Sequence, residues 1–269
     1  MAKRRAGSAT RWGPLFGARA TVWAETWEGP SGWGMPVYEH VLDRTDVDSG
    51  TRVLDCGCGA GRFLRMAADR GARVAGIDAS AELIAIAAER TPDGDFRAGD
   101  IEVLPWENRS FDVVSGFSAF QFADDTVRAL REARRVSSGL VVVVIPTRVP
   151  ESGITSVFKP LFPLFAHDAL ESMKHSGMFA LSEPGKLEDV VGAADLTPFE
   201  NEEIACPIIF DDVDAAQRAF LGAGPTQLAI ESSGEAAVAD AVCGALHSFT
   251  ASDGRVVLTA WYRAVLAQS

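Results

Sequence analysis

One short stretch constrains the fold of this 269-residue chain more than any other. It runs from Thr51 to Phe63 and reads TRVLDCGCGAGRF, so that an apolar run and an aspartate lead into glycines at every second position. Residues 62–68 then follow a helical pattern. A strand, a glycine turn and a helix in this order form the first half of a βαβ unit. Because glycine has no Cβ, a ligand can lie against the turn, next to the free N–H groups of the helix.

A second carboxylate indicates what kind of ligand this turn would hold. Asp78 ends the next apolar run, ARVAGID, and follows Gly59 by 19 positions. An acid about 20 residues beyond such a turn can accept hydrogen bonds from ribose hydroxyls. The pattern here is D-x-G-x-G-x-G, which differs from the dinucleotide fingerprint G-x-G-x-x-G. We therefore expect a nucleoside ligand, and an NAD(P)-dependent oxidoreductase remains the alternative that the glycine spacing disfavours.

The D-x-G-x-G-x-G stretch resembles motif I of the class I S-adenosylmethionine-dependent methyltransferases. Further segments resemble the later motifs in the family's order: Asp78 after the second strand, Asp100-Ile101, the fourth strand with its loop at 111–122, and the helix and fifth strand at 132–145. The resemblance is closest to the methyltransferase type 11 group, which includes ubiquinone and menaquinone biosynthesis enzymes. It is strong over about residues 40–146. Four motifs in one order are more specific than any single motif.

The resemblance implies S-adenosylmethionine as the cofactor and S-adenosylhomocysteine as its product. The implied activity is methyl transfer to a small, hydrophobic or aromatic metabolite, with O-, N- and C-methylation all open. A non-catalytic or non-methylating S-adenosylmethionine-binding relative is a further alternative. The cofactor-binding residues that the resemblance implies are Asp55, Gly57, Cys58, Gly59, Gly61, Asp78, Ala79, Asp100, Ile101, Phe117 and Ser118.

The alternation of apolar runs and helical patterns predicts the fold class. Strands are expected at 51–56, 72–77, 95–98, 111–116 and 139–145, and helices at 61–70, 80–90 and 124–136. This alternation is typical of an α/β protein with a Rossmann-like, doubly wound sheet and helices on both faces. Two later runs, 199–210 and 254–264, predict an antiparallel edge hairpin on the mostly parallel sheet. A small helical cap is expected in addition.

The same pattern divides the chain into four parts. Residues 1–45 are expected to form a basic tail that is mobile over residues 1–11, and then a helical segment that closes over the site. Residues 46–146 form the cofactor-binding core, and 147–183 an inserted cap or lid that is rich in proline and aromatic residues. Residues 184–269 complete the core, with a helical insertion at about 211–250.

Mostly aromatic residues near the expected crevice are the candidates for an acceptor pocket, although packing alone would also explain the aromatic ones. These candidates are Trp23, Trp27, Phe120, Gln121, Phe158, Phe162 and Phe165. His167 and His175 lie in the expected cap and are the candidate general bases. A nucleophile that is already ionised needs no base, so the reaction does not require either histidine.

Composition limits the partners of the chain. The net charge of −12 and the pI of about 4.8 argue against nucleic acid and against an anionic membrane surface as partners. The apolar runs are shorter than the roughly 18 residues of a membrane span. The spacing of the four cysteines fits no metal site, and we expect them to be reduced and buried. We therefore expect a cytoplasmic protein with a small-molecule substrate and no metal, for which a homodimer is an open possibility.

Overall fold

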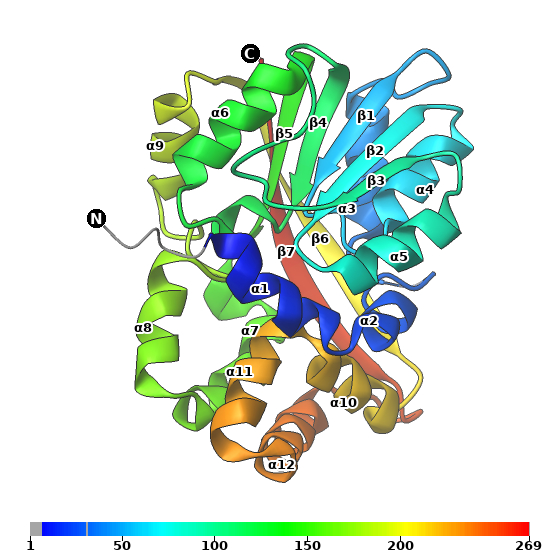
Figure 1. Cartoon of the computed structure of the whole chain (residues 1–269). Coiled ribbons are helices and arrows are strands. Elements are labelled where there is room, and N and C mark those ends of the chain that lie inside the picture. Colours follow the sequence, from blue (N-terminus) through cyan, green and yellow to red (C-terminus); the bar gives the residue numbers. More distant parts are fainter. Residues whose placement is uncertain (1–6, 31, 269) are drawn as a thin grey trace.

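The computed structural model describes residues 7–30 and 32–268, and it contains a seven-stranded sheet with helices on both faces (Figure 1). The strands are β1 Arg52–Cys56, β2 Arg73–Asp78, β3 Asp95–Ala98, β4 Phe111–Phe117, β5 Ser137–Thr147, β6 Thr197–Phe210 and β7 Val256–Gln268. Their order across the sheet is β3-β2-β1-β4-β5-β7-β6. The first five strands are parallel, and β7 pairs antiparallel with both β5 and β6. The predicted fold class, including the antiparallel edge, is confirmed.

The two faces of the sheet bury alternate residues of the central strands β1, β2, β4 and β5. On β1, Val53 contributes to one core and the neighbouring Leu54 to the other. The first core packs against α3 (Met35–Arg44) and α4 (Arg62–Asp69), with α5 (Ala81–Arg90) beside α4. The second core packs against α6 (Thr126–Val136) and α9 (Lys186–Ala193). Strands buried on both faces are the reason that these segments are apolar almost throughout.

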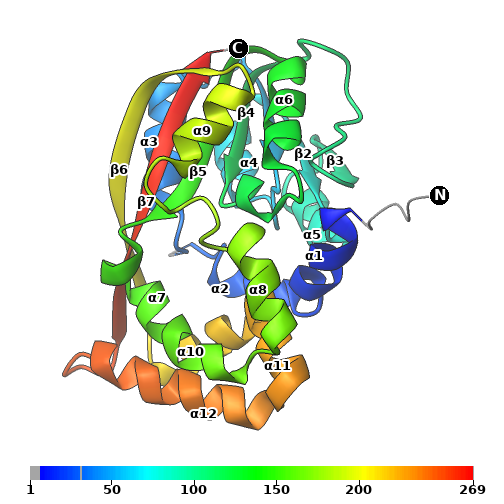
Figure 2. The same cartoon turned by 90° about the vertical axis from the view of Figure 1, so that its left-hand side faces the viewer.

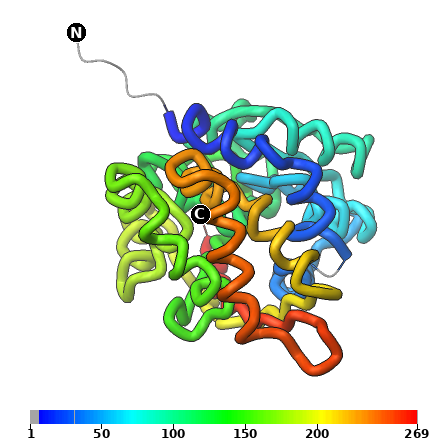
Figure 3. Tube along the Cα trace, turned by 90° about the horizontal axis from the view of Figure 1, so that it is seen from below, coloured from blue at the N-terminus to red at the C-terminus, as the bar shows by residue number. Residues whose placement is uncertain are grey.

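A separate group of helices lies beyond one end of the sheet (Figures 1 and 2). It contains α1 Ser8–Gly17, α2 Ala20–Thr26, α7 Gly153–Phe158, α8 His167–His175, α10 Val213–Gly222, α11 Gly224–Ser233 and α12 Glu235–Leu246. Short 3₁₀ turns lie at η1 Phe120–Phe122, η2 Val149–Glu151, η3 Lys159–Leu164 and η4 His247–Phe249. Figure 3 looks onto this helical layer, in which α1 from the start of the chain lies next to α11 from near its end. Segments that are distant in sequence therefore meet over the same end of the sheet.

Two expectations about these helices need correction. The mobile tail was predicted to include residues up to Arg11, but α1 already begins at Ser8 and buries Trp12. Residues 1–6 of that tail lie outside the described residues. The sequence pattern also does not predict α11, because the first residues of that helix, Gly224 and Pro225, are typical of a turn. Proline is nevertheless favourable in the first turn of a helix, where its missing N–H has no partner to lose.

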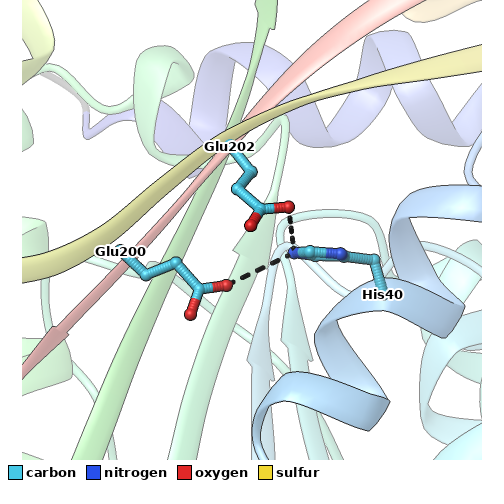
Figure 4. A group of neighbouring side chains, drawn as sticks. All are labelled: His40, Glu200 and Glu202. Atoms are coloured by element: carbon cyan, nitrogen blue, oxygen red, sulfur yellow. Dashed lines mark ion pairs between the residues drawn. The ribbon is translucent and has the colours of Figure 1, made fainter.

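A cluster of charged side chains fastens α3 to the edge strand β6 (Figure 4). Arg44 donates from Nε to both oxygens of Glu200, at 2.8 and 2.9 Å. His40 Nε2 lies 3.6 Å from Glu200 and 3.7 Å from Glu202. Hydrogen bonding and charge from Arg44 lower the pKa of Glu200. Because Arg44 already supplies a cation to Glu200, we interpret the cluster as an ion-pair network that links α3 to β6.

None of the helices in the described part of the chain has the length and apolar character of a membrane span.

Candidate functional site

Acidic residues from three neighbouring strands line one cavity between the sheet and the helical layer. Asp55 lies in β1, Asp78 ends β2, and Asp100 follows β3. Phe117, the last residue of β4, lines the same cavity. Because the carboxyl ends of parallel strands meet at one edge of the sheet, residues far apart in sequence converge there. The predicted convergence of the three acids is what the structure shows.

The glycine turn has a backbone that only glycine adopts readily. Gly57, Gly59 and Gly61 have φ angles of +71°, +57° and +81°. A Cβ on Gly59 would lie 2.1 Å from an oxygen of Glu28. Gly57 and Gly59 line the cavity, but Gly61 does not. Gly61 precedes the first residue of α4, and a Cβ there would lie 2.9 Å from Ala87, so it shapes the turn from behind the cavity wall. Its place in the cofactor site stays a prediction.

Asp78 is held rigidly against the glycine turn. Its two carboxylate oxygens accept hydrogen bonds from the backbone N–H of Gly59 and of Ser80, each at 2.9 Å. Burial raises the pKa of Asp78 to about 6, and these two N–H groups act in the opposite direction. The carboxylate still lines the cavity. It therefore stabilises the turn and can also accept a hydrogen bond from a ligand.

Asp55 is more deeply buried than Asp78, and burial raises its pKa further. Its Oδ1 accepts a hydrogen bond of 2.8 Å from the Ser115 hydroxyl on β4. Burial raises the pKa of Asp55 to about 8, against the effect of Ser115, and the nearby Glu28 and Asp78 raise it further. The neutral form of this carboxyl group is therefore favoured far more than in an exposed aspartate.

The other residues expected around the cofactor also line the cavity: Cys58, Ala79, Ile101 and Ser118. Ser118 is unusual among them because its φ angle is +51°, in the left-handed region that a serine rarely adopts. Its buried hydroxyl has no hydrogen-bond partner among the described residues. Strain and an unpaired hydroxyl at a strand end are typical of a ligand site. These features fit a polar ligand bound at this end of β4.

Glu28 is a site residue that the sequence analysis missed. It follows α2, is 5% exposed, and lines the cavity. One of its oxygens accepts hydrogen bonds from the N–H of Ala60 at 2.8 Å and from Trp23 Nε1 at 2.6 Å, and the other accepts from the N–H of Arg62 at 3.0 Å. Arg90 lies 3.4 Å away, and burial raises the pKa of Glu28. No spacing in the sequence links residue 28 to residue 60, so no local pattern could have identified it.

The position of Glu28 has a direct chemical consequence. The first N–H groups of a helix form an anion site, and in dinucleotide-binding folds that site holds the pyrophosphate. Here the corresponding N–H groups at the start of α4 already donate hydrogen bonds to the Glu28 carboxylate. The cavity therefore does not offer a pyrophosphate the contacts that a dinucleotide uses.

The acceptor-pocket candidates divide into two groups. Trp23, Trp27 and Phe158 line the cavity. Four candidates do not line it, and their role in acceptor binding stays a prediction: Phe120, Gln121, Phe162 and Phe165. Within the turn η1, Phe120 packs in the second core, whereas Phe122 lines the cavity. Gln121 is buried, Phe165 packs in the first core, and Phe162 is exposed.

Several aromatic residues of the cavity wall were not among the candidates. They are Trp12, Phe16, Trp33, Tyr38, Phe122, Phe179, Trp261 and Tyr262. Both tyrosines of the chain belong to this set. Burial raises the pKa of both phenols, so that they act as hydrogen-bond donors and not as bases. The concentration of tryptophan before residue 40 was the sequence signal for this wall, but it did not identify the individual residues.

The two candidate bases lie away from the cavity. His167 and His175 are the first and last residues of α8 and are both exposed. Neither lines the cavity, so the structure gives no support to a role for either as a base, and that role stays a prediction. The helix α8 has no fully buried residue, and its half-buried Leu170 and Met173 pack against the first core.

Together, the sheet order, the acids at the strand ends and the glycine turn define a fold of the class I methyltransferase type. Residues 54–143, about a third of the chain, match the family model described as a methyltransferase domain.

Known proteins agree with this assignment. A malonyl-[acyl-carrier protein] O-methyltransferase of Pectobacterium atrosepticum is 36% identical over 109 residues, which are 40% of this chain and 43% of that protein. A demethylmenaquinone methyltransferase of Chlorobaculum tepidum is 34% identical over 153 residues, 56% of this chain and 61% of that protein. The chain thus spans about half the length of these curated relatives. The crystal structure of the YcgJ protein from Bacillus subtilis superposes with a TM-score of 0.56 at 19% identity, covering 86% of this chain and 97% of that one.

Proposed function

We infer that this protein transfers a methyl group from S-adenosylmethionine to a small, hydrophobic or aromatic metabolite. The observation that carries this inference is the single cavity that holds Asp55, Asp78, Asp100 and the glycine turn together beneath an aromatic wall. The match of residues 54–143 to the family model described as a methyltransferase domain supports it.

Each acid would bind a different part of the cofactor. Asp78 would accept hydrogen bonds from the ribose hydroxyls, because its carboxylate is fixed at the edge of the cavity. Asp100 and Ile101 would hold the adenine. Asp55 and Ser118 would face the amino acid end, where Ser118 has a hydroxyl to donate. Bound S-adenosylmethionine supplies an electrophilic methyl group on its sulfonium.

The protein would promote the transfer mainly by positioning the acceptor and by excluding water. The aromatic wall buries an apolar acceptor, and the phenols of Tyr38 and Tyr262 can donate hydrogen bonds to its polar atoms. No histidine lines the cavity among the described residues. An acceptor that ionises by itself would therefore suit this site better than one that needs a strong base.

The two alternatives make different predictions. A nicotinamide-dependent oxidoreductase would need the pyrophosphate site that Glu28 fills. A non-methylating relative would bind S-adenosylmethionine but release no S-adenosylhomocysteine.

Calorimetric titration with S-adenosylmethionine, S-adenosylhomocysteine and NADH tests the cofactor. We expect the two adenosyl compounds to bind and NADH not to bind, and binding of NADH alone would overturn the proposal. Mass spectrometry of a panel of aromatic and aliphatic acceptors then tests turnover. Cofactor binding without S-adenosylhomocysteine formation across the panel would favour the non-methylating alternative.

A further inference from the structure

Helix α1 turns one of its faces toward the cavity. Ser8, Trp12 and Phe16 all line the cavity, and their spacing of four residues places them on one side of the helix. Trp12 packs edge-on against Phe122 at 4.8 Å between ring centroids, and Phe16 packs in the same way against Trp23 at 5.5 Å. This face is therefore part of the cavity wall along its whole length.

The same helix lies directly over the strand ends that carry the nucleoside-binding candidates. The Ser8 hydroxyl lies 3.4 Å from an oxygen of Asp100. At Gly13 the two backbones are so close that a Cβ would lie 2.4 Å from the carbonyl oxygen of Ala79. Figure 1 shows α1 at that end of the sheet, and Figure 3 shows that α11 flanks it. Thus α1 covers the part of the cavity between Ala79 and Asp100.

Trp12 has an unpaired donor in this covered place. Its side chain is 4% exposed, and its indole N–H has no acceptor among the described residues. By contrast, the indole N–H of Trp23 donates to Glu28 and that of Trp27 donates to the carbonyl of Ala219. Buried N–H groups nearly always have a partner, so an unpaired one in a cavity wall calls for a ligand.

We propose that α1 is the second wall of the nucleoside site and that Trp12 is a specificity-determining residue for the cofactor. The Trp12 ring packs against the purine, and its N–H donates to the nucleoside. The purine then lies between α1 and the loops that carry Ala79 and Ile101. Helix α1 lies outside the segment that matches the methyltransferase-domain family, so this wall is a feature of the chain and not of the family model. The inference rests on the proposed function, because it assumes an adenosyl ligand.

Substitution of Trp12 tests the proposal by calorimetry with S-adenosylhomocysteine. Trp12→Phe keeps an aromatic ring and removes the N–H, and we expect its affinity to be roughly tenfold lower than that of the unaltered protein, the effect of losing one buried hydrogen bond. Trp106→Phe is the matched control, because Trp106 lies outside this cavity and donates to Asp95. Its affinity should be unchanged. Urea unfolding of each variant shows whether the fold is kept.

Hydrogen–deuterium exchange of the unaltered protein gives a second test that needs no variant. We expect S-adenosylhomocysteine to protect the amides of α1, while those of α12, which lines no part of the cavity, stay unchanged. A protein that binds no S-adenosylhomocysteine would refute the proposed function. Binding with unprotected α1 amides, or with a Trp12→Phe affinity within twofold of the original, would overturn the role of α1 and Trp12 alone.

Discussion

Asp78 should make cofactor binding depend on pH between 7 and 5. Burial raises its pKa to about 6, and its carboxylate lines the cavity while it holds the N–H groups of Gly59 and Ser80. The ionised form is the stronger acceptor for ribose hydroxyls. If only that form binds, the competent fraction falls from about 90% at pH 7 to about 9% at pH 5, and the dissociation constant rises roughly tenfold.

The direction of this effect follows from the sign of the pKa shift. A carboxyl group whose pKa is higher in the folded protein is less easily ionised there, so acidification through pH 6 removes the binding-competent charge. The same protonation favours the folded state, so Asp78 itself gives no reason for unfolding at pH 5. Burial raises the pKa of Asp55 to about 8, above this range.

Calorimetric titration of S-adenosylhomocysteine at pH 5, 6 and 7 measures the effect, with circular dichroism to check the fold at each pH. Asp78→Asn is the matched variant, since it keeps the shape of the side chain and cannot ionise. We expect it to bind about 1–3 kcal/mol more weakly at pH 7, roughly 5- to 150-fold, with little further change at pH 5. A flat profile for the unaltered protein would refute the reasoning. An equal slope in the variant would assign the titration to another group.

Two further predictions concern residues at and away from the cavity. Glu28→Ala leaves two backbone N–H groups and the Trp23 indole without their acceptor, so urea unfolding should show a loss of stability of about 2–4 kcal/mol. The control Glu25→Ala, at an exposed residue, should change stability by less than about 0.5 kcal/mol. A loss below about 1 kcal/mol for Glu28→Ala would contradict its capping role. Replacing both His167 and His175 by alanine should leave the rate of S-adenosylhomocysteine formation within about twofold, because both side chains are exposed and neither lines the cavity; a hundredfold loss would restore a histidine base.

The sequence by itself determined the core and the cofactor side of the site. The strands and helices between residues 51 and 146 were predictable because each follows from a local apolar period and a local turn. The convergence of Asp55, Asp78 and Asp100 then followed from a general rule, since the ends of parallel strands meet at one edge. The position of each of these acids depends only on where its strand ends, and local sequence patterns predict the strand ends.

The tertiary structure alone decided what surrounds that core. Glu28 meets the start of α4 across 32 positions of sequence, and Trp12 reaches the cavity only because α1 packs across the strand ends. The direction in which a side chain of an irregular segment points depends on its packing partners. For that reason Phe122 replaced Phe120 in the wall, and His175 turned out to lie on the surface. A sequence pattern carries the period of a regular element, whereas contacts between distant segments exist only once the chain has folded.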